Sequence, residues 1–146
     1  MTTTIHGRAR RLSAALLMSS AVALVVFGQP AQAMPQQREY DAFFSSRYNY
    51  CDAKLVGALY GQDADGGKVI IGQKILNGIG TNVPVVLRES RGYGNACEWE
   101  DTGLSYSDAR VLARTWGFAD PYEAKLKAAD LFTNGREQQV RNGLGH

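Results

Sequence analysis

The chain contains two segments of similar sequence, and this internal repeat most restricts the fold that it can adopt. Residues 50–57 read YCDAKLVG and residues 106–113 read YSDARVLA, which agree in residue or residue type at nearly every position. With a one-residue gap, the match continues in the pairs Tyr60-Gly61 and Trp116-Gly117, Lys68 and Lys125, Ile75 and Phe132, Asn77-Gly78 and Asn134-Gly135, Val83 and Val140, and Leu87 and Leu144. Self-similarity of this kind is typical of repeated supersecondary units. We therefore predict two similar units, at about residues 49–87 and 105–144.

The second unit carries the clearest helix signals. Ser105 and Asp108 have the spacing of an N-terminal capping pair. Apolar or small side chains then recur at the i, i+3, i+4 and i+7 positions of one helical face, and a glycine follows them: Ala109, Leu112, Ala113, Trp116 and Gly117. This pattern predicts a helix that begins after Ser105 and stops at the glycine.

A second helix of this unit is predicted from Pro121 to about Thr133. Asp120 supplies an N-cap side chain, proline suits the first helical position, and Glu123 completes a capping box. The dipeptide Asn134-Gly135 then fits a C-terminal cap, where a residue with positive φ is needed.

The first unit repeats these helix signals. Asn49 and Asp52 stand at the start of its leading helix, and Asn77-Gly78 stands at the end of its second helix. We interpret Asp52 and Asp108 as helix-capping groups. The sequence thus predicts an all-α fold, in which two tandem units of about three helices each pack about a pseudo-two-fold relation as one small domain. Tyr60 and Trp116 are interpreted as aromatic residues of the core. Lys68 and Lys125 are interpreted as solvated side chains at helix edges.

The first 33 residues are predicted to be a cleavable secretory signal. Three arginines precede an apolar run from Leu12 to about Gly28, and Ala31-Gln32-Ala33 has the form of a cleavage site. The run is shorter than the roughly 20 residues of a membrane-spanning helix, which favours cleavage over an uncleaved membrane anchor. The mature chain would then be residues 34–146, a single domain in the periplasm or outside the cell, with no membrane span after cleavage.

The two cysteines are predicted to form a disulfide that closes the domain. Cys51 lies in the leading helix of the first unit, and Cys97 lies in residues 88–104, a glycine-rich stretch that joins the units and reads as an ordered loop. An even number of cysteines in an exported chain favours pairing, which would hold this loop in place. Upstream, residues 37–48 are predicted to add a short helix whose aromatic side chains pack on the repeats.

Removal of the leader changes the charge balance of the protein. The full chain has 16 basic and 14 acidic residues, and three arginines lie in the leader, so the mature part has 13 basic against 14 acidic residues, a net charge of −1. This charge gives no electrostatic reason to bind nucleic acid or an anionic membrane surface. We therefore do not expect nucleic acid as a partner.

The mature sequence offers little of the chemistry that common enzymes use. Its only histidine is His146, because His6 lies in the leader. Ser-His and Cys-His nucleophile pairs and the usual zinc sites are excluded, and we expect neither a metal nor a cofactor. No nucleotide-binding glycine motif and no HExxH motif occur, so carboxylates are the only acid and base groups left. These observations favour a protein that is not an enzyme.

Residues 63–67, DADGG, resemble the opening of a calcium-binding loop, with oxygen ligands at alternate positions before a glycine. However, the twelfth position counted from Asp63 is Lys74 rather than a glutamate, and the second repeat lacks the pattern. We interpret the segment as a solvated loop between helices.

One acidic and aromatic segment is a candidate ligand site. Glu98, Glu100 and Asp101 surround Trp99, and Tyr93 is close by. Carboxylates beside aromatic faces are typical of glycan-binding and glycosidase sites. Neighbouring loop positions do not define the carboxylate separation that catalysis needs. A structural role, in which Trp99 covers the disulfide or fills a gap between the repeats, is the simpler alternative.

The sequence favours a non-catalytic binding or interaction module, such as a periplasmic inhibitor, an immunity protein, a chaperone or an accessory factor. Its partner would be another protein or an envelope component. The alternative is a glycan-binding protein or cell-wall-acting enzyme that uses residues 98–101, and a third class is a purely structural envelope component. A glycan-binding protein is expected to expose Trp99, whereas an interaction module is expected to expose an apolar patch or to form a dimer.

Overall fold

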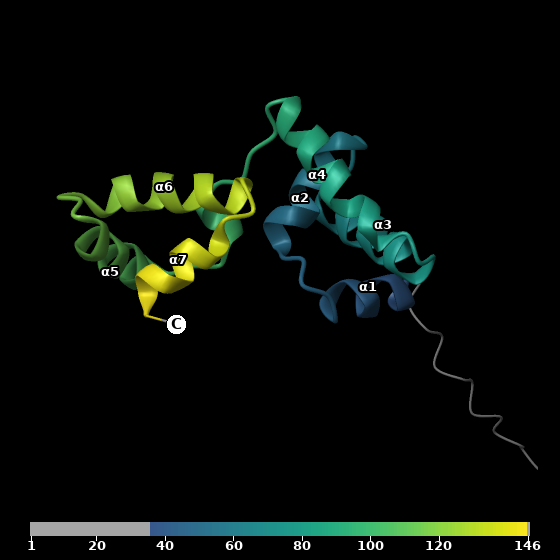
Figure 1. Ribbon diagram of the computed structural model, residues 1–146, viewed down its shortest axis with the longest axis horizontal. Helices are drawn as coiled ribbons and strands as arrows, with labels where there is room; N and C mark the ends of the chain where they lie inside the picture. The colour runs from purple at the N-terminus through teal and green to yellow at the C-terminus, as the bar shows by residue number, and fades with distance from the viewer. Residues whose placement is uncertain (1–35, 146) are drawn as a thin grey trace, which may run out of the picture. The chain divides into compact units, whose positions relative to one another are not determined.

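The computed structural model describes residues 36–145, and in this part of the chain every regular element is a helix (Figure 1). The elements are α1 (Gln37–Phe44), α2 (Tyr50–Leu59), α3 (Ala64–Leu76), α4 (Val83–Gly92), α5 (Tyr106–Trp116), α6 (Pro121–Thr133) and α7 (Glu137–Leu144), with two 3-10 segments, η1 (Gly80–Asn82) and η2 (Trp99–Thr102). The predicted all-α class is confirmed. The predicted leader, residues 1–33, lies outside the described residues. No helix in the described range is long and apolar enough to cross a membrane.

Helices α2, α5 and α6 begin where the sequence predicts them to begin, because side chains cap their free backbone N–H groups. At the start of α2, Asn49 Oδ1 accepts a hydrogen bond from the Asp52 amide at 3.0 Å, and Asp52 Oδ2 accepts one from the Asn49 amide at 3.1 Å. Ser105 and Asp108 form the same reciprocal box at α5. Helix α6 spans Pro121–Thr133 as predicted, but Asp120 caps it through the amide of Tyr122 rather than through a reciprocal box.

Replacing Asp108 by alanine is expected to lower the free energy of unfolding by about 1 kcal/mol, because the half of the α5 capping box that the Asp108 carboxylate provides is lost. Asp108 Oδ2 accepts hydrogen bonds from the Ser105 amide at 2.8 Å and from the Ser105 hydroxyl at 2.7 Å. Urea denaturation of wild type and variant measures the loss, with Arg110→Ala on the exposed side of α5 as the control. An unchanged stability of D108A would show that the bonds accepted by the Asp108 carboxylate contribute nothing.

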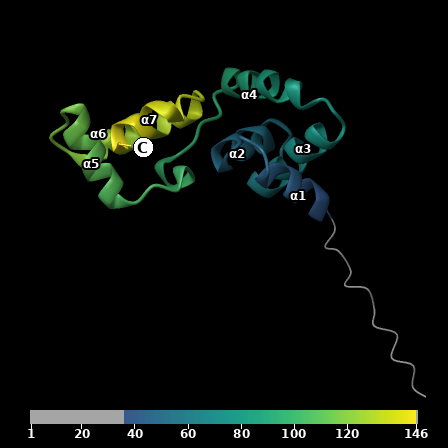
Figure 2. The same cartoon turned by 60° about the horizontal axis from the view of Figure 1, so that its bottom comes forward.

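Glycines allow the first three helices to approach closely. Helix α3 packs against both α2 and α1, as Figure 2 shows. A Cβ atom added to Gly67 would overlap the carbonyl oxygen of Ala53 and lie 2.8 Å from the backbone nitrogen of Gly57. A Cβ atom on Gly72 would meet the backbone of Glu39 in α1 in the same way. The backbones of α1, α2 and α3 are therefore in direct contact at these positions.

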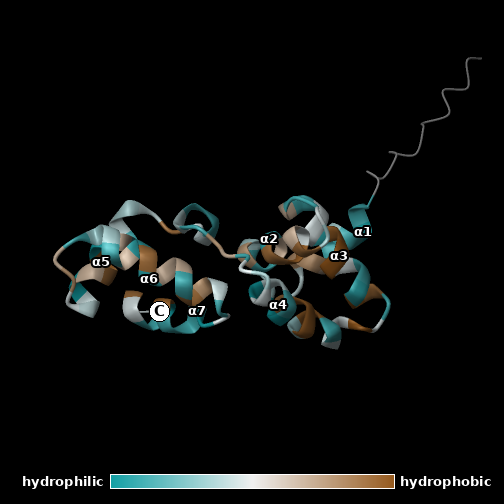
Figure 3. Cartoon of the chain, turned by 90° about the horizontal axis from the view of Figure 1, so that it is seen from above, coloured by the Kyte–Doolittle hydropathy of each residue, from teal (hydrophilic) through white to brown (hydrophobic). Residues whose placement is uncertain are grey.

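The buried core is continuous along the described chain. Its largest fully buried side chains include Leu55, Ile71 and Leu112. Figure 3 shows a hydrophobic stretch on α3, whereas most of α7 is hydrophilic and contributes one buried residue, Val140. The segment Asp63–Gly67, expected to be a loop, instead forms the N-cap and first turn of α3.

Helix α4 continues to Gly92, so five residues of the stretch that we expected to be a loop are helical. The reason is tertiary: Ser90 is fully buried, and its hydroxyl donates a hydrogen bond to the carbonyl oxygen of Leu55 at 2.5 Å. The same hydroxyl accepts a hydrogen bond from Asn95 Nδ2 at 3.1 Å. These bonds tie the end of α4 to α2.

One aromatic residue and two lysines lie elsewhere than expected. Tyr60 is 49% exposed, because it is the C-cap residue of α2, whereas Trp116 is partly buried and packs against the core. Lys68 lies over the Tyr50 ring, with its ammonium 5.1 Å from the ring centroid. Lys125 lies over the Tyr106 ring at 5.4 Å. These two lysines are therefore cation–π partners rather than solvated stems.

Candidate functional site

The predicted disulfide between Cys51 and Cys97 is present, and it fixes the start of the candidate loop. Cys51 is fully buried in α2. The Cys97 amide also donates a hydrogen bond to the Thr133 hydroxyl at the end of α6, at 2.9 Å. Cys97 thus attaches the loop to α2 through the disulfide and to the end of α6 through a hydrogen bond.

A second set of contacts holds the following turn, η2. Asp101 Oδ2 accepts a hydrogen bond from the Glu98 amide at 2.8 Å and from the Lys54 ammonium at 2.5 Å. This Asp101 carboxylate raises the pKa of Lys54 above its ordinary value. The Thr102 hydroxyl donates to the carbonyl oxygen of Trp99 at 2.6 Å. Residues 97–102 therefore present their outward side chains from a restrained backbone.

Three of the predicted site residues, Glu98, Trp99 and Glu100, line a groove of about 290 Å³. The other wall of this aromatic groove is one face of α6. The remaining lining residues are Cys97, Tyr122, Lys125, Leu126 and Ala129. Tyr122 and Leu126 are 60% and 55% exposed. The Lys125 ammonium lies 5.6 Å from the centroid of the Trp99 ring.

The other two predicted site residues do not line this groove. The Asp101 carboxylate forms a salt bridge with Lys54 and accepts a hydrogen bond from the backbone amide of Glu98. Tyr93 is 75% exposed and borders a separate cavity of about 510 Å³, together with Ala58, Leu59, Tyr60, Glu89 and Asn95. The structure therefore brings together three of the five residues and adds the face of α6. That face is readable in the sequence as the i, i+3, i+4, i+7 spacing of residues 122, 125, 126 and 129, which sequence reasoning did not connect with the loop.

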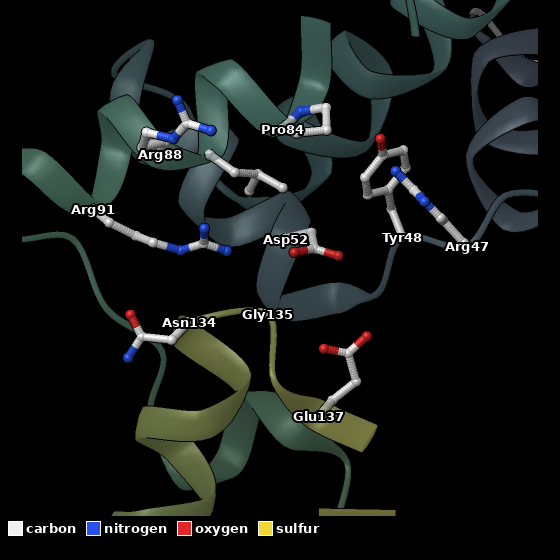
Figure 4. Close-up of a pocket in the computed structure, with 10 residues that line it drawn as sticks. Arg47, Tyr48, Asp52, Pro84, Arg88, Arg91, Asn134, Gly135 and Glu137 are labelled. Carbon is white, nitrogen blue, oxygen red and sulfur yellow. The ribbon is translucent and has the colours of Figure 1, made fainter. Parts of the chain in front are cut away.

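A third cavity, the arginine cleft, has a volume of about 390 Å³. Figure 4 shows its charged side chains: Arg88 and Arg91 from α4, Arg47 from the segment before α2, Asp52 from α2, and Glu137 from the first turn of α7. Uncharged lining residues are Tyr48, Pro84, Leu87, Asn134 and Gly135. Sequence reasoning missed this cleft, because it assigned Arg88 and Arg91 to a loop and Asp52 to a cap alone.

Asp52 is the buried charge of the arginine cleft, with 8% of its surface exposed. Burial raises the pKa of its carboxyl group above the ordinary value, and the nearby Glu137 carboxylate acts in the same direction. The hydrogen bond from the Asn49 amide and the charges of Arg91 and Arg47 lower the pKa of Asp52 and oppose this shift. Asp52 is therefore both a helix cap and a carboxylate that gains from a cationic neighbour.

Arg91 is oriented by the far side of the arginine cleft. Its Nε donates a hydrogen bond to the carbonyl oxygen of Thr133, which leaves the terminal nitrogens directed into the cleft (Figure 4). Within the described part of the chain, Arg47 and Arg88 form no salt bridge. Arg91 forms none either, so none of the three guanidinium groups has a salt-bridge partner among the described residues, although the charges of Arg91 and Arg47 act on Asp52.

The described residues contain no group of three or more histidine, cysteine, aspartate or glutamate side chains placed to hold a metal ion. Comparison with protein-family models, with curated proteins and with solved structures finds no match to this chain.

Proposed function

We propose that this chain is an exported, non-catalytic binding module that holds a helix of a partner protein in the aromatic groove. One observation supports this most strongly: Tyr122 and Leu126, one turn apart on α6, are more than half exposed beside a restrained loop. Large apolar side chains at i and i+4 are typical anchors for a helix in a groove. A restrained groove also costs less conformational entropy on binding than a mobile one.

We propose further that the chain consists of two tandem units related by duplication. Supporting features recur at matching positions: the boxes Asn49/Asp52 and Ser105/Asp108, the N-caps Asp63 and Asp120, the positive-φ glycines Gly78 and Gly135, and the pairs Lys68–Tyr50 and Lys125–Tyr106. Local sequence similarity together with equivalent caps and cation–π pairs is typical of repeated units.

This relation suggests why the face of α6 is open. In the first unit, α1 packs on α3, where Val69 is buried and Gly72 contacts the backbone of Glu39. The repeat aligns these two residues with Leu126 and Ala129, which line the aromatic groove. In the second unit the shorter η2 stands in the place of α1: it packs on α6, and the Lys125 ammonium lies over Trp99 as the Lys68 ammonium lies over Phe44 of α1. A helix from a partner would occupy the part of this face that η2, at 4 residues against the 8 of α1, leaves uncovered.

The charge of the groove specifies the partner further. Two carboxylates, Glu98 and Glu100, and one ammonium group, Lys125, line the groove; the Glu98 side chain is 77% exposed and also pairs with Lys54 at 3.7 Å. A partner helix with an apolar stripe flanked by lysine or arginine would complement these carboxylates. We therefore propose a basic amphipathic helix as the occupant.

A glycan is the second candidate occupant, because Trp99 lines the groove beside two carboxylates. Against it, the Lys125 ammonium lies over the Trp99 ring, where a sugar ring would stack.

As to location, a buried disulfide is compatible with the oxidising compartment that we propose for the mature chain.

Selection from a displayed library of amphipathic helical peptides tests the proposal. Peptides with an apolar stripe flanked by basic residues are expected to be enriched. Leu126→Asp is expected to weaken their binding by about 30-fold or more in calorimetry, because a charge replaces a central apolar anchor. Val85→Asp is the matched control, since Val85 is 56% exposed on α4, and it is expected to leave affinity unchanged.

Three outcomes would contradict the proposed occupant. Enriched peptides that bind L126D as tightly as wild type would place binding elsewhere. Failure of enrichment, with sugar polymers changing the fluorescence of Trp99 in a Trp116→Phe background, would favour a glycan. A dimer in sedimentation that L126D abolishes would identify a second copy of this chain as the occupant.

A further inference from the structure

The arginine cleft carries charged groups of both signs around one cavity. We infer that this cleft binds a small zwitterion, an amino acid or a short peptide with free ends, whose carboxylate lies between Arg88 and Arg91 and whose ammonium group faces Asp52 and Glu137. The inference concerns a different cavity from the aromatic groove and does not depend on the function proposed above.

The carboxylate end is supported by the geometry of α4. Arg88 and Arg91 are three residues apart and therefore lie on the same face of the helix. The contact with the Thr133 carbonyl orients Arg91, and Arg88 forms no salt bridge with a described residue. The planar guanidinium group binds carboxylates through two parallel hydrogen bonds, so two adjacent guanidinium groups form a strong carboxylate site.

The ammonium end is supported by the opposite wall. In Figure 4 the Glu137 side chain points toward Asp52 across the cleft, and neither carboxylate forms a salt bridge with a described residue. Two carboxylates that face one cavity repel each other, and a cation between them relieves this repulsion. The burial of Asp52 strengthens its attraction to such a cation, because water screens the charge less.

The mixture of charges favours a zwitterion over a simple anion. A bare anion would meet three guanidinium groups but also two carboxylates, and one of these is buried. A simple cation would meet the arginines. A cavity of about 390 Å³ lies within the range of small-ligand sites and leaves room for a few residues of peptide. A ligand with both charges matches both walls, and its ammonium group would share Asp52 with the nearby charges of Arg91 and Arg47.

The test uses alanine, dialanine and trialanine, which differ in the separation of their charged ends. Each is titrated into the protein with native disulfide, and backbone amide shifts are followed by NMR. At least one member is expected to saturate shifts confined to residues of the arginine cleft. Its N-acetylated form and its C-terminal amide are each expected to bind about tenfold more weakly, because each lacks one charge.

Variants assign the two ends of the ligand. Arg88→Gln is expected to weaken binding of the best zwitterion about tenfold and to leave its amide, which lacks the carboxylate, almost unaffected. Glu137→Gln is expected to weaken binding of the best zwitterion about tenfold and to leave binding of its N-acetylated form, which lacks the ammonium group, almost unaffected. Arg114→Gln on the exposed side of α5 is the control and is expected to change nothing.

The inference is overturned if none of the three zwitterions shifts a cleft residue at concentrations up to tens of millimolar. It is also overturned if inorganic phosphate or the N-acetylated form binds as tightly as the zwitterion, since the cleft would then be a simple anion site. Unchanged urea denaturation of both variants confirms that weaker binding does not come from unfolding.

Discussion

Gly67→Ala is expected to lower the free energy of unfolding by about 3 kcal/mol, because the added methyl group would meet backbone atoms of α2. Gly67 lies inside α3, where helix propensity alone predicts a gain of up to about 1 kcal/mol for alanine. The structure predicts the opposite sign. The new Cβ atom would overlap the Ala53 carbonyl and press on the backbone of Gly57, and backbone atoms cannot rotate away.

The measurement is urea denaturation of Gly67→Ala beside Gly92→Ala. Gly92 ends α4, and a Cβ atom added there meets no atom within 4 Å. G92A is therefore expected to be neutral or to stabilise by up to about 1 kcal/mol, because the unfolded chain loses freedom. If both variants had the same stability, α2 and α3 would not be in backbone contact, and the packing described for the first three helices would be wrong.

Helix starts and stops were predictable because their causes are local. Asn49 with Asp52 and Ser105 with Asp108 are three residues apart, so the capping bond is visible in the sequence before any fold is known. The pairing of the cysteines followed from there being only two. The length of α4 was not predictable in this way, because the buried bond from Ser90 to the backbone of α2 joins residues 35 positions apart.

The candidate sites were predictable only in part, for the same physical reason. Glu98, Trp99 and Glu100 are adjacent in the sequence and were identified, but the wall of the aromatic groove that carries Leu126 comes from a helix packed against η2. The arginine cleft joins Asp52 to Arg91 and Glu137, which meet only through tertiary packing. Residue types indicate what chemistry a chain contains, and packing determines which groups share a cavity.

Removal of the disulfide by Cys51→Ala with Cys97→Ala is expected to lower the free energy of unfolding by about 4 kcal/mol. The bond joins residues separated by 46 positions, and closing a loop of this length removes much entropy from the unfolded chain. Small domains have a total stability of about 5–15 kcal/mol, so the variant is expected to be close to unfolding at 37 °C. Urea denaturation of the oxidised wild type and of the double variant measures the difference.

The same variant tests whether the disulfide also organises the aromatic groove. In this variant the backbone amide at position 97 still donates to the Thr133 hydroxyl at the end of α6, and η2 remains attached to α2 through Lys54 and Asp101. In the folded double variant at low temperature, these bonds are expected to keep peptide affinity at the groove within about threefold of wild type, since neither bond involves sulfur. A loss of affinity much larger than threefold in the folded variant would mean that the covalent bond, rather than the polar contacts, positions Trp99. Unchanged stability of the double variant would contradict the 4 kcal/mol expectation, and would mean that the unfolded chain gains little freedom when the loop is opened.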